Sequence, residues 1–204
     1  MTGRSRPLRA DAARNRAKLL DAATAVFGER GLDAPLEQIA RHAEVGIATL
    51  YAHFPSREAL VAAVLPGRLA AVDQLGGVAL ADPDPWRGFT GFVVGLFALR
   101  AQDRGLNDAL AEWVAADSEI VREACQRGLD LAEKIIERAR LDGRLRSDFT
   151  SADLSTIGRA MAHVINESTE ATASEWRRCL TFFLDGLRAH PADADSPATT
   201  GHPV

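Results

Sequence analysis

Three side chains with hydrogen-bonding tips, Thr49, Tyr51 and His53, lie close together on one short segment. Around them, apolar residues at positions 36, 39, 40, 43, 45, 50, 51 and 54 predict two short amphipathic helices joined by a tight turn. This spacing lets the first helix hold the second through a small shared core. The outer face of the second helix is then free to enter a DNA major groove, which is wide enough for one α-helix.

Positive charge is concentrated near the N-terminus, although the chain carries a formal net charge of −4. The first twenty residues hold one acid, Asp11, and a basic set: Arg4, Arg6, Arg9, Arg14, Arg16 and Lys18. A basic arm leading into a helix is an electrostatic footprint for phosphate. The alternative is a solvated leader without a binding role.

Signatures of catalysis and metal binding are missing from the sequence. It has no GxSxG, HExxH or phosphate-loop motif, and no histidine pair at metal-ligand spacing. The two cysteines, Cys125 and Cys179, lie far apart and form no CxxC motif, which argues against a disulfide scaffold and a zinc site. We therefore expect no enzyme activity, no metal and no cofactor.

Helical periodicity continues along the whole chain, without strand-like alternation, and predicts an all-α fold. Gly31 is expected to end the first helix, and Gly46 to relieve the backbone at the turn between the two short helices. Pro66-Gly67 is a candidate kink, and residues 76–85 are predicted to form a loop. The predicted helices cover residues 11–30, a segment after Pro35, 47–54, a segment from Ser56, a segment from Pro85, 105–116, 118–141, 151–169 and 172–189.

The segment 39–60, IARHAEVGIATLYAHFPSREAL, resembles the N-terminal DNA-binding domain of the tetracycline-repressor (TetR) family. The shared elements stand in register: Ile39-Ala40, Thr49-Leu50-Tyr51, His53-Phe54, Ser56-Arg57-Glu58 and Leu60. The resemblance covers roughly residues 10–65. It departs from the family pattern at four positions, where Ala34, Glu44, Gly46 and Ala48 replace a common threonine, glycine, serine and glycine.

The resemblance implies that different residues contact the phosphates and the bases of the DNA. Tyr51 and His53 would contact phosphates and position the protein, whereas base reading would fall to Gly46, Ile47 and Ala48 with Thr49 and Gln38. The basic residues Arg9, Arg14 and Arg57 complete the predicted DNA-binding set. Two alternatives remain at this stage: Tyr51 as a core residue, and His53 as a surface residue without a task.

The resemblance also implies that the remaining helices form a ligand pocket and a dimer interface. The predicted ligand-binding residues are Trp86, Phe89, Phe92, Phe97, Trp113, His163 and Asn166. The predicted dimer residues are Leu154, Ile157, Met161, Ile165, Trp176, Leu180, Phe183, Leu184 and Leu187. The alternatives are that the dimer set consists of ordinary core stripes and that His163 and Asn166 are satisfied elsewhere.

These inferences divide the chain into a helix-turn-helix domain with its basic arm (1–65), a helical ligand-binding and dimerisation domain (66–189) and a disordered tail (190–204). The expected protein is a cytoplasmic homodimeric repressor that binds a palindromic operator in double-stranded DNA and is released by an unidentified small-molecule effector. An activator of the same family and a helical protein-interaction module are the alternatives. No membrane association is expected, because the longest uncharged apolar stretch, 88–99, falls short of the roughly 20 residues needed to span a bilayer.

Overall fold

The computed structural model describes residues 5–112, 119–167 and 173–189. Within these ranges it contains helices and no strand, apart from an isolated bridge between Leu145 and Arg188, so the all-α prediction is confirmed. The helices are α1 (Ser5–Arg30), α2 (Leu36–His42), α3 (Ile47–His53), α4 (Arg57–Ala81), α5 (Pro85–Gln102), α6 (Arg104–Glu112), α7 (Glu119–Leu141), α8 (Ser151–Glu167) and α9 (Ala173–Gly186).

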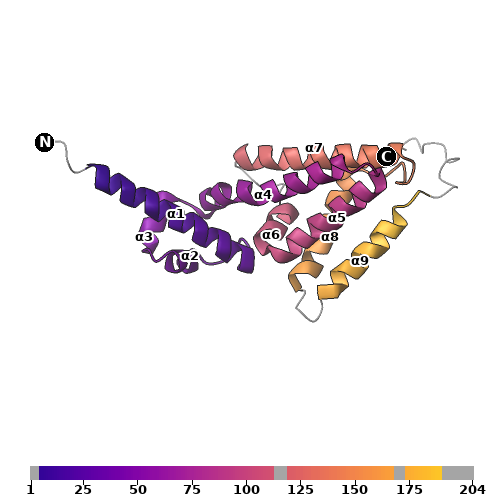
Figure 1. Ribbon diagram of the computed structural model, residues 1–204. Helices are drawn as coiled ribbons and strands as arrows, with labels where there is room; N and C mark the ends of the chain where they lie inside the picture. Colours follow the sequence, from indigo (N-terminus) through magenta and orange to yellow (C-terminus); the bar gives the residue numbers. More distant parts are fainter. Residues whose placement is uncertain (1–4, 113–118, 168–172, 190–204) are drawn as a thin grey trace, which may run out of the picture.

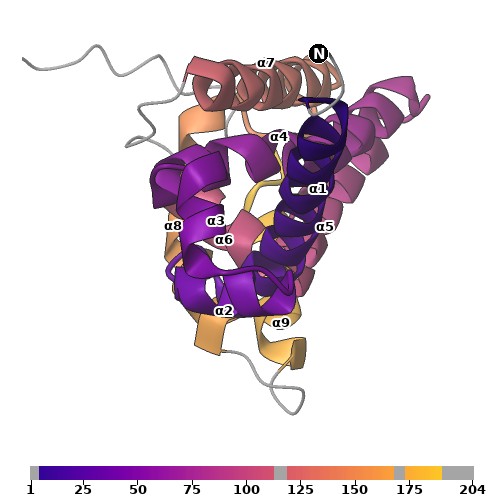
Figure 2. The same cartoon turned by 90° about the vertical axis from the view of Figure 1, so that its left-hand side faces the viewer.

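The molecule is elongated, with α1, α2 and α3 at one end and the bundle of α5 to α9 at the other (Figure 1). Helix α4 runs from the first group into the bundle, where α7 lies along it. Viewed along this long axis, α1 to α3 stand in front of the remaining helices (Figure 2). The short helix α3 therefore lies at the end of the molecule that is remote from most of the bundle.

Two hydrophobic clusters hold these two groups of helices. The first buries Phe27, Ile39 and Leu50 completely and extends along α4 to Val64. The second begins on the same helix at Leu65 and includes Phe89, Phe97, Ile136 and Trp176. The change from one core to the other thus occurs inside a continuous helix, so a movement of α4 displaces side chains in both cores.

The predicted loop over 76–85 is wrong for residues 76–81, because α4 continues to Ala81, and only residues 82–84 connect it to α5. Gly76 packs against Leu131 of α7, and Arg138 of α7 donates hydrogen bonds to the carbonyls of Leu80 and Asp82 at the end of α4. These contacts offset the low helix propensity of the glycine pair. Pro66 does not interrupt the helix either.

The start of the chain also differs from its expected form. Helix α1 begins at Ser5, so the backbone of residues 5–10 is helical rather than an arm that precedes a helix. The predicted end of α1 is confirmed, since Gly31 has a φ of +84° and donates its N–H to the carbonyl of Phe27. The predicted disordered tail, 190–204, lies outside the described residues.

Helix α4 is long and apolar enough to cross a membrane by length and composition alone. Its buried side chains, however, pack against α5 and α7 in the second cluster. The core helix of a bundle passes the same test, so this feature is weak evidence for a membrane segment.

The crossing of α4 and α5 depends on Gly88, because a Cβ atom there would lie 2.5 Å from the backbone oxygen of Ala79. We expect Gly88→Ala to lower the free energy of unfolding by about 1–3 kcal/mol, measured by urea denaturation. Gly91 provides the matched control on the same helix, since a Cβ there meets nothing within 4 Å. Gly91→Ala should raise stability by about 0.5–1 kcal/mol, and equal effects of the two substitutions would contradict the close crossing.

Candidate nucleic-acid interface and ligand pocket

Helices α2 and α3 are joined by a tight turn over residues 43–46 and share a buried core. Leu50 of α3 and Ile39 of α2 are both fully buried, and the N–H of Val45 donates to the carbonyl of Ala40 at 3.0 Å. The left-handed residue of this turn is Glu44, with a φ of +57°. Gly46 has an extended backbone and precedes α3 as its N-cap, so its predicted role in relieving the turn is wrong.

The outer face of α3 is exposed along most of its length. Ile47 is 36% exposed and Tyr51 is 48% exposed, whereas Leu50 and Phe54 are buried. This exposure rules out the alternative that Tyr51 is a core residue. Gly46 and Ala48 are also exposed, and Thr49 and His53 are half-buried at the sides of the helix. The polar tips that the sequence singled out therefore belong to one short, well-supported helix.

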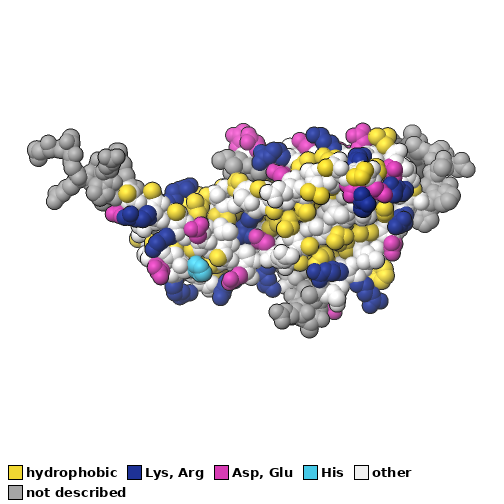
Figure 3. Space-filling view, in the orientation of Figure 1, with side chains coloured by type: hydrophobic (Ala, Val, Ile, Leu, Met, Phe, Trp, Pro, Cys, Tyr) yellow, Lys and Arg dark blue, Asp and Glu magenta, His cyan; other side chains and the backbone are white. Residues whose placement is uncertain are grey.

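The other predicted DNA-binding residues differ in their surroundings. Gln38 is half-buried on α2, and Arg14 is exposed on α1 beside its ion-pair partner Asp11. The backbone of Arg9 lies in α1, but its side chain is outside the described part of the chain. Basic and acidic side chains are interspersed on the face of this end seen in Figure 3.

Arg57 requires a correction, because the structure gives it partners within the protein. One of its terminal nitrogens donates to the carbonyls of Leu32 and Ala34, both at 2.6 Å. These bonds fix the loop between α1 and α2. We therefore assign Arg57 as a positioning residue for the α2–α3 pair and remove it from the predicted DNA-contacting set.

Glu44 occupies a backbone conformation that costs a residue with a side chain roughly 1–2 kcal/mol. We expect Glu44→Gly to raise the free energy of unfolding by about 1 kcal/mol in thermal or urea denaturation. Lys18→Gln is the control, because it removes the same exposed 3.7 Å ion pair without changing the turn. No stability gain from Glu44→Gly, or an equal gain from Lys18→Gln, would contradict the assignment of strain to this backbone.

A buried polar junction connects this end of the molecule to the bundle through α6. Arg68 of α4 pairs with Asp103, donates to the carbonyl of Thr24 in α1, and has a pKa lowered by burial. Asp103 also accepts the N–H of Leu106 at 2.9 Å and so caps α6. Three helices, α1, α4 and α6, are thereby held together at one point.

Asp108 of α6 makes the second connection. One carboxylate oxygen accepts the backbone N–H of Leu32 at 3.0 Å, and the other accepts from the side-chain amide of Asn166 in α8 at 3.0 Å. The backbone of Gly31 passes so close to this carboxylate that a Cβ atom there would collide with it. The loop that precedes α2 is thus bonded directly to the bundle.

These bonds continue inward through Asn107, which is fully buried. Its side-chain amide donates to the side-chain oxygen of Asn166 and to the carbonyl of Ala162, both at 3.0 Å. Its own side-chain oxygen accepts from Nε of Arg100 at 2.8 Å. We call the series Arg100, Asn107, Asn166, Asp108 and the backbone N–H of Leu32 the polar relay.

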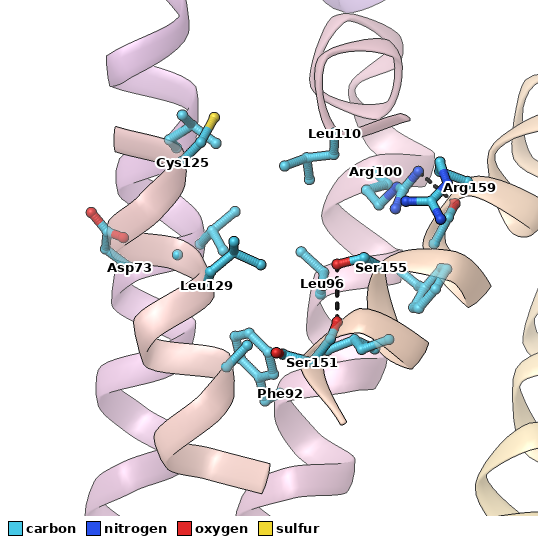
Figure 4. A pocket seen from close by; sticks show the side chains of 17 residues that line it. Asp73, Phe92, Leu96, Arg100, Leu110, Cys125, Leu129, Ser151, Ser155 and Arg159 are labelled. Atoms are coloured by element: carbon cyan, nitrogen blue, oxygen red, sulfur yellow. Dashed lines mark hydrogen bonds between the residues drawn. The ribbon is translucent and has the colours of Figure 1, made fainter. Parts of the chain in front are cut away.

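Arg100 belongs both to the polar relay and to the wall of a pocket inside the bundle (Figure 4). The empty space of this pocket, including its open mouth, is about 780 Å³. Most of the wall is apolar and comes from α4, α5, α7 and α8. The lining residues are Leu69, Val72, Asp73, Phe92, Leu96, Phe97, Arg100, Leu110, Cys125, Gly128, Leu129, Ala132, Ser151, Leu154, Ser155, Gly158 and Arg159.

Two of the seven predicted ligand-binding residues, Phe92 and Phe97, line this pocket. Trp86 and Phe89 do not, because they pack in the core, with the Phe89 ring 5.7 Å from Trp86 and 5.9 Å from Phe149. Trp113 lies outside the described residues.

His163 and Asn166 also lie away from the pocket wall. The side chain of His163 is 78% exposed and lies 3.3 Å from Glu167. Asn166 is a member of the polar relay. The alternative reading of these two residues, as groups satisfied elsewhere, is therefore the one that the structure favours.

The polar residues of the pocket, above all Arg100, are absent from the predicted ligand-binding set. A signal was present, because Arg100 follows Leu96 and Phe97 by one helical turn and so falls on the buried face of α5. Burial lowers the pKa of Arg100 to about 10, which leaves the guanidinium charged at neutral pH. Burial raises the pKa of Cys125 to about 11, so this thiol is protonated and unreactive.

The predicted dimer residues need a larger correction. Five of them are buried in the core of a single chain, where the side chains cannot reach a partner: Leu154, Met161, Ile165, Trp176 and Leu180. Ile157, Leu184 and Leu187 are half-buried against the same core. Phe183 is 40% exposed, and its neighbour Phe182, which the sequence analysis did not select, is 62% exposed.

Asp108 is expected to contribute to stability through its two acceptor contacts. Asp108→Ala should lower the free energy of unfolding by about 1–3 kcal/mol, because it leaves the partly buried N–H of Leu32 without its acceptor. The control is Asp130→Ala, which removes only an exposed contact with Gln126. If urea denaturation showed equally small losses of unfolding free energy for the two variants, the contacts of Asp108 would contribute nothing to stability.

Comparison with known proteins gives two family matches and many structural neighbours. Residues 19–64 match the model described as bacterial regulatory proteins, tetR family, and residues 84–189 match the SbtR-like transcriptional regulator C-terminal domain. No curated protein matches the sequence.

Two solved structures of TetR regulators share about a third of the sequence. One, from Streptomyces coelicolor, is 33% identical over 85% of this chain and 98% of its own, with a TM-score of 0.57. The other, from Mycobacterium vanbaalenii, is 32% identical over 90% of this chain and all of its own, with a TM-score of 0.53. FadR from Bacillus subtilis, solved with stearoyl-CoA, is 14% identical over 83% of this chain and 98% of its own, with a TM-score of 0.58. At this identity the comparison shows only that the two proteins share a fold.

Proposed function

The chain belongs to the TetR family of bacterial transcriptional regulators, and from this premise we propose that it is a homodimeric, ligand-released repressor of a palindromic operator. The observation that carries the proposal is the exposed outer face of α3, which the buried Leu50 and Phe54 hold from behind. A helix supported in this way can enter a major groove without losing its own packing.

On the operator, Tyr51 and His53 would donate to phosphates and fix the register of α3. Arg9 and Arg14 of α1 would add ionic contacts with the phosphates. Base reading would be sparse, since Ile47 and Ala48 offer only apolar contact with thymine methyl groups and Gly46 offers only its backbone. Thr49 and Gln38 are the members of the set with polar side chains that could bond a base edge. Sequence-dependent DNA shape would therefore contribute much of the specificity.

The dimer would form through the exposed faces of α8 and α9 rather than through their buried stripes. Phe182 and Phe183 support this assignment because they leave large apolar surfaces on the outside of α9. Two-fold symmetry would then place two copies of α3 against half-sites in successive major grooves, roughly 34–36 Å apart or somewhat more.

Release would follow when a small molecule occupies the pocket and favours a different placement of the heads. Helix α4 supports such a switch because it carries residues of both cores. The polar relay provides a second physical connection from the pocket wall to the loop before α2. The stearoyl-CoA complex of FadR is a precedent for a ligand in a protein of this fold.

Selection of bound sequences from a random duplex library tests the DNA-binding proposal. We expect the wild-type protein to enrich a palindrome, and the double variant Tyr51→Ala, His53→Ala to bind it at least tenfold more weakly because two phosphate contacts are lost. The preferred sequence should stay the same, since phosphate contacts read no bases.

Arg122→Ala, an exposed change on α7, is the control and should bind normally. Failure of the wild type to enrich any sequence would overturn the proposal. Enrichment that the double variant retains in full would show that α3 does not dock through Tyr51 and His53.

A further inference from the structure

The pocket contains a buried positive charge that forms no salt bridge with the described residues. Arg100 is 3% exposed and donates to the side-chain oxygen of Asn107 and the carbonyl of Gly158, both at 2.8 Å. Both acceptors are neutral, and the nearby carboxylate of Asp108 offsets the burial of the charge only in part, because burial still lowers the pKa of Arg100. A buried cation in this state is costly unless an anion compensates it.

Arg159, an exposed residue of α8, adds a second guanidinium to the same side of the pocket. It lies beside Arg100 in Figure 4, and its one hydrogen bond with a described residue goes to the neutral hydroxyl of Thr156 at 2.9 Å. Ser155, one turn earlier on α8, also lines this side and donates to the carbonyl of Ser151 at 3.0 Å. Two guanidinium groups at one wall can bind both oxygens of a carboxylate.

The opposite side of the pocket carries an acidic side chain instead of basic ones. Asp73 of α4 lies there, across the pocket from Arg100 (Figure 4). Its Oδ1 atom is buried and accepts no hydrogen bond from the described residues. This carboxylate repels an anion and accepts a hydrogen-bond donor. Between the two sides the wall is apolar, with Phe92, Leu96 and Leu129.

Taking the regulator function proposed above as the basis, we propose that the effector is an apolar carboxylate, with an aryl or medium-length alkyl body. Its carboxylate binds Arg100 and Arg159, and its body packs between Phe92 and Leu129. A hydroxyl or amino group at the far end, where present, donates to Asp73. The separation of positive and negative sides thus sets both the ligand class and its orientation.

Calorimetric titration of the purified wild-type protein with three probes of nearly equal shape tests this proposal. The probes are 4-butylbenzoate, 4-butylbenzyl alcohol and 4-butylbenzylamine at neutral pH. We expect the benzoate to bind at least tenfold more tightly than the alcohol, and the amine to bind most weakly. Arg159→Gln should weaken benzoate binding about tenfold and alcohol binding less than twofold. The exposed α7 variant Arg122→Gln should leave both unchanged.

Equal affinity for the three probes, preference for the amine, or binding of none of them would overturn the proposal. A benzoate preference that Arg159→Gln leaves intact would also overturn the assignment of this wall. The titration contains no DNA, so a failure here is distinct from a failure of the repressor proposal, which the random-duplex selection decides. The wild-type comparison does not depend on the folding of any variant.

Discussion

The bond between the carboxylate of Asp108 and the backbone N–H of Leu32 joins residues 76 positions apart in sequence. Its geometry requires Gly31, since a side chain at that position would collide with the carboxylate. It also requires α6 to be held in place. Asp103 caps the start of α6, and Arg68 of α4 pairs with Asp103. The position of α2 and α3 relative to the bundle depends on this junction, because the loop it holds leads directly into α2.

The pocket is connected to the junction by a continuous series of hydrogen bonds. Arg100 lines the pocket and donates to Asn107, whose amide is bonded to Asn166 beside Asp108. In the proposed complex, a ligand carboxylate would bond the same guanidinium that donates to Asn107 and to the carbonyl of Gly158. It can shift the heads only to the extent that it binds one arrangement of the relay more tightly than the other.

Sequence reasoning succeeded where the determinants are local. The spacing of Leu36, Ile39 and Leu50 identifies the two short helices, because residues three and four apart share a helix face. It failed at residues 76–81, where contacts with α7 override the weak helix propensity of a glycine pair. It also failed for Trp176 and Leu180, since an apolar stripe indicates burial but does not distinguish the chain's own core from a partner. The relay could not be predicted at all, because its members come from four separate segments.

If the repressor is released as proposed, the polar relay couples changes in the bundle to the loop before α2. Amide hydrogen exchange at Leu32 in an Asn166→Ala variant tests this coupling, since Leu32 and Asn166 bond different oxygens of Asp108 and Asn166 is not among the residues that line the pocket. We expect exchange at Leu32 to be faster by about tenfold or more, because Asp108 loses the partner that orients it. The amide of Ala59, which donates to Ser56 in the same part of the molecule, should be unchanged. Unaltered exchange at Leu32 would contradict the claim.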